Sequence, residues 1–240
     1  MIVDLFPTPM MILNIRDELL DDEVARIGEL WPPFTKRYSG YDPDSTAAQD
    51  FTEAWDKKKD EFDYRFLDVM MPGCQLKSTL EKYANKFIHD AWGELTSQVA
   101  ITTTWLNIYE ANEPLDRHAH LNSIVSGTLY LSAVPEHGPF NVHSPSTRER
   151  MILGRTEKHN RFTRNSMSFY PKQWDLYLFP SSLEHSVGVH HDPSIPDRCS
   201  LSFNTFYSGH FRPWHRYGHF NEYRQTIETV QNNDTTDENK

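Results

Sequence analysis

The sequence predicts a mainly β protein with flanking helices, and three observations support this prediction. A chain of 240 residues fits a single all-β sandwich or barrel. Its 15 prolines and 11 tyrosines suit a loop-rich β protein better than a helix bundle. Between residues 97 and 207, short segments rich in β-branched and aromatic residues alternate with Pro, Gly, Asn and Asp. Many short strands at near-regular spacing indicate a sandwich, a barrel or a jelly roll.

Upstream of this β core, residues 17–93 are expected to provide helical support. A helix is predicted over residues 20–31, because acidic residues favour its first turn and Pro32-Pro33 stops it. A second helix is predicted over residues 75–92, where apolar side chains recur on one face and Gly93 ends the pattern. Its apolar face needs a partner, and the β core that follows is the expected one.

The remaining segments complete one expected domain, residues 1–230. The strands predicted for the core are 99–109, 126–134, 166–170, 175–179, 185–189 and 198–206. The other predicted segments are a strand at 10–13, a loop with a short helix near 47–58, a polar lid or excursion at 144–165, a helix at 215–230 and a disordered tail at 231–240.

Charge and cysteine content exclude several classes of protein. The formal net charge is −10, and an acidic chain repels phosphate backbones, which argues against a duplex nucleic-acid binder. The two cysteines, Cys74 and Cys199, exclude a disulfide framework and a thiolate zinc cluster, and they fit a reducing compartment. No basic leader is present, and no apolar run approaches the roughly 18 residues of a membrane span. A cytoplasmic protein is therefore expected.

Two histidines that lie two residues apart, His118 and His120, are the first candidate metal ligands. Side chains at i and i+2 of a β-strand point to the same face, so this pair would present two imidazoles side by side. Histidine is the commonest metal ligand because its neutral imidazole is a good donor near pH 7. A distal histidine, His185, opens a later predicted strand and would lie at a barrel mouth. Taken singly, a histidine is more often structural than a ligand, and His185 by itself is better explained as a hydrogen-bonded turn residue.

Two of the predicted strands carry polar side chains on a single face. The first offers an amide and a phenol that need partners, which a bound polar ligand would supply. The second offers an arginine, which binds a carboxylate through two charge-assisted hydrogen bonds, and serines beside it. An internal ion pair and an ordinary core tyrosine are the alternatives. The two faces are Trp105-x-Asn107-x-Tyr109 and Arg198-x-Ser200-x-Ser202-x-Asn204.

In this order, His-x-His, a distal histidine and Arg-x-Ser resemble the motifs of the 2-oxoglutarate- and Fe(II)-dependent oxygenases. More narrowly, the chain is similar to an uncharacterised group of these oxygenases, some of them phage-encoded, over roughly residues 97–207. The segments that carry the resemblance are Trp105-x-Asn107-x-Tyr109, His118-x-His120, Ser126-Gly127-x-x-Tyr130-Leu131, Phe179-Pro180-Ser181 with His185, and Arg198-x-Ser200-x-Ser202-Phe203-Asn204. The resemblance implies a double-stranded β-helix, a cupin-like jelly roll, and an enzyme that uses Fe(II), 2-oxoglutarate and O₂.

Carried over residue by residue, the resemblance implies roles for particular positions of this chain. His118 and His185 match the two metal-binding histidines of the family. Arg198 matches the arginine that binds the distal carboxylate of 2-oxoglutarate. The positions implied to lie around that co-substrate are Arg198, Ser200, Tyr109 and Asn107.

His120 is where the chain departs from the family's pattern, which has Asp or Glu at this position. Three outcomes are open: His120 ligates the metal in place of the acid, His120 lies behind the ligands while water or an anion binds, or the site is no oxygenase. Asp116, on the same face as His118, is a further candidate carboxylate and ranks below His120. A cupin enzyme is disfavoured because no acid follows His120 at the spacing that cupins use.

The sequence therefore predicts a 2-oxoglutarate- and Fe(II)-dependent oxygenase, most simply a hydroxylase, that couples oxidative decarboxylation of 2-oxoglutarate to C–H oxidation. A small molecule or a protein side chain is the expected substrate, with nucleic acid disfavoured and no membrane attachment expected. The alternatives are a non-catalytic module that keeps the barrel, and a three-histidine metalloenzyme without 2-oxoglutarate. The sequence indicates neither the substrate nor the oligomeric state.

Overall fold

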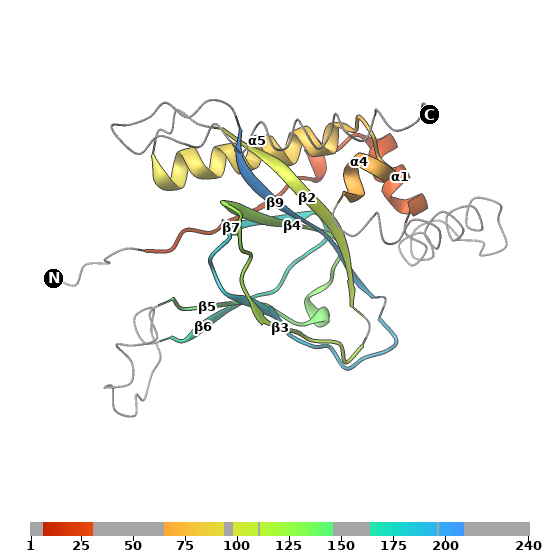
Figure 1. The fold of residues 1–240 in the computed structure, drawn as a ribbon. Helices are drawn as coiled ribbons and strands as arrows, with labels where there is room; N and C mark the ends of the chain where they lie inside the picture. Colours follow the sequence, from red (N-terminus) through yellow and green to blue (C-terminus); the bar gives the residue numbers. More distant parts are fainter. Residues whose placement is uncertain are drawn as a thin grey trace, which may run out of the picture.

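The core of the protein consists of two antiparallel β-sheets that face each other (Figure 1). The computed structural model describes residues 7–30, 65–93, 98–109, 111–145, 164–195 and 197–208. The larger sheet contains β1 (Met11–Asn14), β7 (Asp175–Pro180), β4 (Val125–Ser132), β9 (Arg198–Ser208) and β2 (Gln98–Tyr109), in that order. The smaller sheet contains β3 (Leu115–His118), β8 (His185–Val187), β5 (Phe140–His143) and β6 (Ser166–Phe169), in that order.

From β2 to β9 the chain passes back and forth between the two sheets, except that β5 and β6 follow each other within the smaller sheet. Strands β2, β4, β7 and β9 lie in the larger sheet, whereas β3, β5, β6 and β8 lie in the smaller one. All pairings between neighbouring strands are antiparallel. This order is that of a double-stranded β-helix, or jelly roll, and confirms the predicted fold class.

Helices cover the outer face of the larger sheet (Figure 1). The helical elements are a 3₁₀ turn at Arg16–Glu18, α1 (Asp21–Leu30), α4 (Phe66–Met70), α5 (Gln75–Trp92) and a 3₁₀ turn at Pro135–His137. None of the helices within the described ranges is both long enough and apolar enough to cross a membrane.

The long helix α5 buries one apolar stripe against the larger sheet. Its stripe meets the outward side chains of β4, β7 and β9, among them Leu129, Leu178 and Phe203, in one core cluster. Burial of each leucine-sized side chain stabilises the fold by about 1.5–3 kcal/mol. The helix ends at Gly93, whose φ of +86° favours glycine. The buried residues of α5 are Leu76, Thr79, Leu80, Tyr83, Ala84, Phe87 and Ile88.

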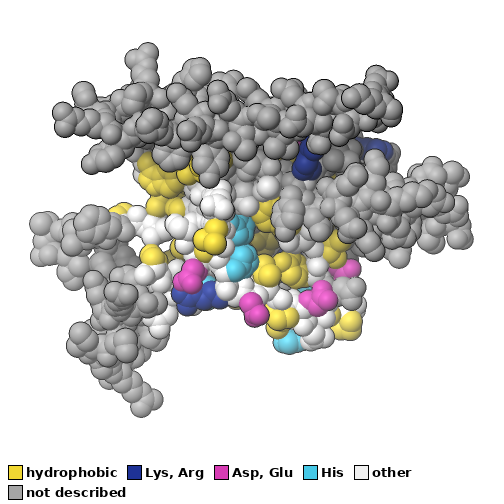
Figure 2. Space-filling view, viewed as in Figure 1, with side chains coloured by type: hydrophobic (Ala, Val, Ile, Leu, Met, Phe, Trp, Pro, Cys, Tyr) yellow, Lys and Arg dark blue, Asp and Glu magenta, His cyan; other side chains and the backbone are white. Residues whose placement is uncertain are grey.

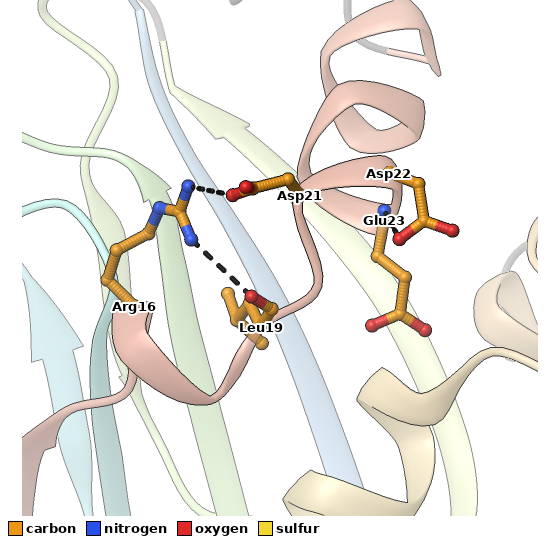
Figure 3. Close-up of polar contacts among 5 residues, drawn as sticks. All are labelled: Arg16, Leu19, Asp21, Asp22 and Glu23. Carbon is orange, nitrogen blue, oxygen red and sulfur yellow. Dashed lines mark hydrogen bonds and ion pairs between the residues drawn. The ribbon is translucent and has the colours of Figure 1, made fainter.

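The first turn of α5 is capped by a side chain from α1. Cys74, at the N-cap position, makes no capping hydrogen bond through its side chain. Instead Oε1 of the buried Glu23 accepts the backbone N–H groups of Gln75 and Leu76, the second at 3.1 Å. Figure 3 shows the Glu23 carboxylate pointing away from α1, on the side opposite the Arg16–Asp21 ion pair. The carboxylate meets two N–H groups that the helix itself leaves unpaired.

Side chains of α5 also bond to the backbone of β2, the last strand of the larger sheet. The amide of Asn85 accepts the N–H of Val99 at 2.9 Å and donates to its carbonyl at 2.8 Å. The carboxylate of Glu81 accepts the N–H of Ile101 at 2.9 Å. These bonds fix how α5 sits on the sheet, in addition to the apolar contact.

The elements predicted from the sequence are largely confirmed within the described ranges. Helix α5 has the predicted bounds, α1 and β1 lie within about a residue of theirs, and the six predicted core strands are all present. Five short elements were not predicted, namely β3, β5, α4 and the two 3₁₀ turns. The predictions for residues 47–58, 215–230 and 231–240, and for most of 144–165, fall outside the described residues.

Candidate metal centre

Three histidines from the smaller sheet and its rim converge on one point. β3 ends at His118, and the antiparallel register places it opposite His185, the first residue of β8. His120 follows two residues later, beyond the end of the strand, where its N–H donates to the carbonyl of Ser181 at 2.9 Å. One potential ligand atom from each histidine lies within 4.8 Å of the others. The predicted pairing of His118 and His120 is therefore present, although the strand itself stops at His118.

Backbone carbonyls fix the orientation of two of these rings. Nδ1 of His118 lies 2.8 Å from the carbonyl of Asp116, and Nδ1 of His185 lies 2.9 Å from the carbonyl of Leu183. A carbonyl only accepts, so Nδ1 carries the proton in both rings and Nε2 keeps a lone pair. Asp116 takes part through its backbone, and its exposed carboxylate is outside the histidine cluster.

The ring of His120 is held by side chains instead. Its Nδ1 lies 2.7 Å from Oδ1 of Asn204 and 2.8 Å from Oγ of Ser126. Its Nε2 lies 3.3 Å from Nε2 of His118. These two Nε2 atoms are therefore close neighbours within the cluster. The centre of the Trp105 ring lies 5.6 Å from the centre of the His120 ring.

Burial keeps His120 and His185 in the form that binds metals. Desolvation lowers the pKa of His185 to about 4, and it also lowers the pKa of His120 against the opposing effect of the Asn204 hydrogen bond. Near neutral pH both imidazoles are therefore uncharged. Figure 2 shows histidine side chains beside hydrophobic ones on the face of the molecule viewed in Figure 1.

A cavity between the two sheets adjoins the three histidines. Aromatic and aliphatic side chains make up most of its wall, and the inward face of the larger sheet adds a few hydroxyl and amide groups. Such a mixture of apolar walls and few polar groups is typical of sites for small molecules. The lining residues are Trp105, Asn107, Leu115, His118, His120, Gly127, Thr128, Tyr130, Phe140, Phe179, His185, Val187 and Ser202.

A comparison with protein families matches the part of the chain that forms this site. Residues 103–204 fit the family described as "Putative 2OG-Fe(II) oxygenase". The β core of this chain matches the 2OG-Fe(II) oxygenase family. The matched segment contains the three histidines and all four predicted co-substrate residues. No curated protein matches the chain.

The chain is also similar to several solved structures. A 2OG-Fe(II) oxygenase family oxidoreductase from Burkholderia pseudomallei is 18% identical, with a TM-score of 0.38, over 55% of this chain and 54% of its own. A prolyl-4-hydroxylase from Pseudomonas putida is 12% identical, with a TM-score of 0.46, over 84% and 89%. AviO1 from Streptomyces viridochromogenes Tue57 is 14% identical, with a TM-score of 0.49, over 84% and 91%.

The arginine predicted to bind the co-substrate is buried with an unused donor. Arg198 is 1% exposed, its guanidinium carbon lies 4.8 Å from the centre of the Tyr109 ring, and Nη1 donates to the carbonyl of His137 at 3.5 Å. Nη2 is buried and has no hydrogen-bond partner among the described residues. Burial lowers the pKa of Arg198 and raises that of Tyr109. A buried guanidinium donor without a partner favours an anionic ligand.

The other two predicted co-substrate residues lie on the same inward face. Ser200 is buried and pairs with Asn107 across β9 and β2. Nδ2 of Asn107 donates to Ser202 at 2.7 Å, and its Oδ1 accepts from the Trp105 indole at 3.1 Å. The amide of Asn107, for which a bound polar ligand was one expected partner, is therefore already bonded by its neighbours.

Sequence reasoning missed several polar residues of this region. Ser126 belongs to the segment Ser126-Gly127-x-x-Tyr130-Leu131, but nothing in the spacing of that segment predicts its contact with Nδ1 of His120. Two buried histidines, His137 and His190, have rings 5.2 Å apart and lie beyond Arg198. His137 sits in a 3₁₀ turn and His190 follows β8, so neither has a periodic pattern that would reveal it. The alternation of β9 was the one available signal for Asn204.

Proposed function

We propose that this protein is a 2-oxoglutarate- and Fe(II)-dependent oxygenase, most simply a hydroxylase, with Fe(II) held by His118, His120 and His185. The observation that carries the proposal is the convergence of three imidazoles with ligand atoms within 4.8 Å. Imidazole nitrogens are suitable ligands for several first-row divalent ions, and Fe(II) is one of them. The hydrogen bonds to Nδ1 of His118 and His185 leave their Nε2 atoms free to coordinate.

In this proposal Arg198 binds the distal carboxylate of 2-oxoglutarate. Its unpartnered Nη2 is a charge-assisted donor in a buried place, and the ring of Tyr109 beside it keeps the guanidinium in position. Ser200 supplies a hydroxyl on the same strand face, and its register partner Asn107 lies beside it on β2. The cationic side chain and the histidine cluster would then hold the two ends of one dicarboxylate.

Bound Fe(II) would supply the redox chemistry by which O₂ is activated. Overall, 2-oxoglutarate, O₂ and a substrate C–H group give succinate, CO₂ and an alcohol, with one oxygen atom in each of succinate and alcohol. The protein's part is to orient the reactants and to exclude water. The apolar cavity wall, including Phe140, Phe179 and Val187, serves that exclusion.

The use of His120 in place of a carboxylate changes the charge of the centre. Three neutral imidazoles leave the full charge of a divalent ion, whereas the usual two histidines and one carboxylate reduce it by one unit. Because the distal carboxylate of 2-oxoglutarate would pair with Arg198, its one carboxylate at the metal would leave a net charge of about +1 there. We expect this centre to favour anionic ligands more than a centre with a carboxylate does.

Anaerobic titration of the Fe(II)-loaded protein with 2-oxoglutarate tests the proposal. A visible charge-transfer band should develop, and Arg198→Ala should weaken 2-oxoglutarate binding without loss of Fe(II). Arg16→Ala is a matched control, because Arg16 pairs with Asp21 near the N-terminal helix and is far from the cluster in sequence and fold. The absence of both a band and 2-oxoglutarate turnover would refute the proposal.

The same experiment separates the two alternative functions. A three-histidine metalloenzyme without 2-oxoglutarate would bind Fe(II) but give no band, and its activity would survive Arg198→Ala. A non-catalytic module would purify without stoichiometric metal, and His118→Ala would leave its properties unchanged.

A further inference from the structure

We propose that Asn204 and Ser126 are positioning residues that set the tautomer of His120 and aim its Nε2 at the metal. This inference rests on the three-histidine centre of the proposed function. His120 is then a metal ligand whose orientation Asn204 and Ser126 fix.

The two side chains come from adjacent strands and meet at the ring of His120. Ser126 on β4 and Asn204 on β9 are paired in register, with Ser126 Oγ 2.7 Å from Asn204 Oδ1. Nδ1 of His120 lies 2.7 Å from Asn204 Oδ1 and 2.8 Å from Ser126 Oγ. Ser126 Oγ also lies 2.8 Å from Oγ of Ser181, whose carbonyl holds the His120 backbone. Both serines are at most 1% exposed.

The donors and acceptors in this cluster can be assigned from simple counting. The oxygen of Asn204 only accepts, and Ser126 has a single proton, which it gives to Asn204 or to Ser181. Neither group then has a proton to donate to His120. Nδ1 of His120 must therefore carry the proton and donate it to Asn204 and Ser126. Nε2 of His120 therefore carries a lone pair.

That lone pair faces a second one. The carbonyl of Asp116 holds the proton of His118 on Nδ1, so Nε2 of His118 is also unprotonated. The two Nε2 atoms lie 3.3 Å apart with no proton between them. Two facing lone pairs repel each other, and a cation at the centre of the cluster removes the repulsion. The positions of Asn204 and Ser126 thus favour a metal ion over a plain histidine–histidine hydrogen bond.

Titration with Co(II), followed by visible absorption, tests whether Asn204 acts through His120. Asn204→Leu keeps the size but removes the acceptor, and should weaken Co(II) binding by about 10- to 100-fold, as is typical for groups behind a metal-bound histidine. Asn204→Asp keeps the acceptor and should retain the affinity. Asn141→Leu is the matched control, because Asn141 accepts a hydrogen bond from the hydroxyl of Ser168 within the smaller sheet. This substitution should leave Co(II) binding unchanged.

Nitrogen NMR of histidine in the metal-free protein gives a second readout that does not depend on catalysis. The resonances of His120, identified by their loss in His120→Gln, should show a proton on Nδ1 and none on Nε2, and Asn204→Leu should reduce this preference. Unchanged Co(II) affinity in Asn204→Leu, or a proton on Nε2 in the native protein, would overturn the inference. If these results hold while 2-oxoglutarate turnover is absent, the positioning role stands and the proposed function fails.

Discussion

Substitution of Gly127 by alanine should perturb both the core and the metal centre. Gly127 lies on β4, next to Ser126, where the ring of Phe203 and the side chain of Leu178 cross directly over the backbone. A Cβ atom at this position would meet Cζ of Phe203 most closely, with Cε1 at 2.6 Å and Cδ2 of Leu178 at 2.8 Å. Carbon atoms pack at no less than about 3.5 Å, so the ring would have to move by more than about 0.9 Å.

The core around this glycine has little room for such a movement. Phe203 and Leu178 are both 0% exposed and lie in the cluster beneath α5. Overpacking of a dense core costs about 1–3 kcal/mol, and contact with two immobile side chains places Gly127→Ala near the upper limit, about 3 kcal/mol. Urea denaturation would measure this loss as a lower midpoint with an unchanged slope. Because Ser126 is adjacent, Co(II) affinity should fall as well.

A double-mutant cycle with Phe203→Leu determines whether the ring is the cause. The shorter leucine leaves room for the new methyl group, so Gly127→Ala should cost at least about 1 kcal/mol less in the Phe203→Leu background, within the range usual for contacting residues. Equal costs in the two backgrounds, or a change below about 0.5 kcal/mol in the native one, would refute the reasoning.

Three further predictions concern the helical layer and the metal centre. Glu23→Ala should lower the free energy of unfolding by about 2 kcal/mol, since two N–H groups of α5 lose a charged acceptor, and Glu23→Gln should recover part of this in the same urea assay. Leu80→Ala should cost about 2–5 kcal/mol, because Leu80 is 0% exposed in the helix–sheet core, and a loss under about 1 kcal/mol would contradict that packing. Ni(II) binding should quench tryptophan emission through Trp105, whose ring lies 5.6 Å from that of His120, and Trp105→Phe should remove this quenching while His118→Ala abolishes the binding that causes it.

The sequence predicts best the elements whose formation depends on local pattern. Helix α5 could be placed to the residue because its apolar side chains recur with helical period and Gly93 ends it. Strands β2 and β9 are long, rich in β-branched and aromatic residues, and alternate clearly in polarity. By contrast, β3 (Leu115–His118) and β5 (Phe140–His143) have four residues each and exist because β8 pairs with both. In these two segments the local pattern is too weak to indicate a strand, and pairing with β8 establishes them.

Prediction of the candidate site followed the same division. His118, His120 and His185 could be proposed as ligands, because spacing and resemblance both point to them, and the structure brings all three together. Their hydrogen-bond partners could not be predicted. Ser126 and Asn204 are 78 residues apart in sequence and meet only through the register of β4 and β9. The pairing of β4 and β9 therefore creates the hydrogen-bond partners of the His120 ring, and it cannot be read from the neighbours of His120 in sequence.

The bonds between α5 and β2 have a consequence for how copies of the protein meet. A terminal strand of a sheet usually offers unpaired N–H and carbonyl groups, which invite a strand of another molecule to extend the sheet. Asn85 already bonds both the N–H and the carbonyl of Val99, and Glu81 bonds the N–H of Ile101. Helix α5 therefore protects the edge strand β2 from pairing with a strand of another molecule. Asn85→Ala would leave the backbone groups of Val99 unpaired and should promote self-association at high protein concentration.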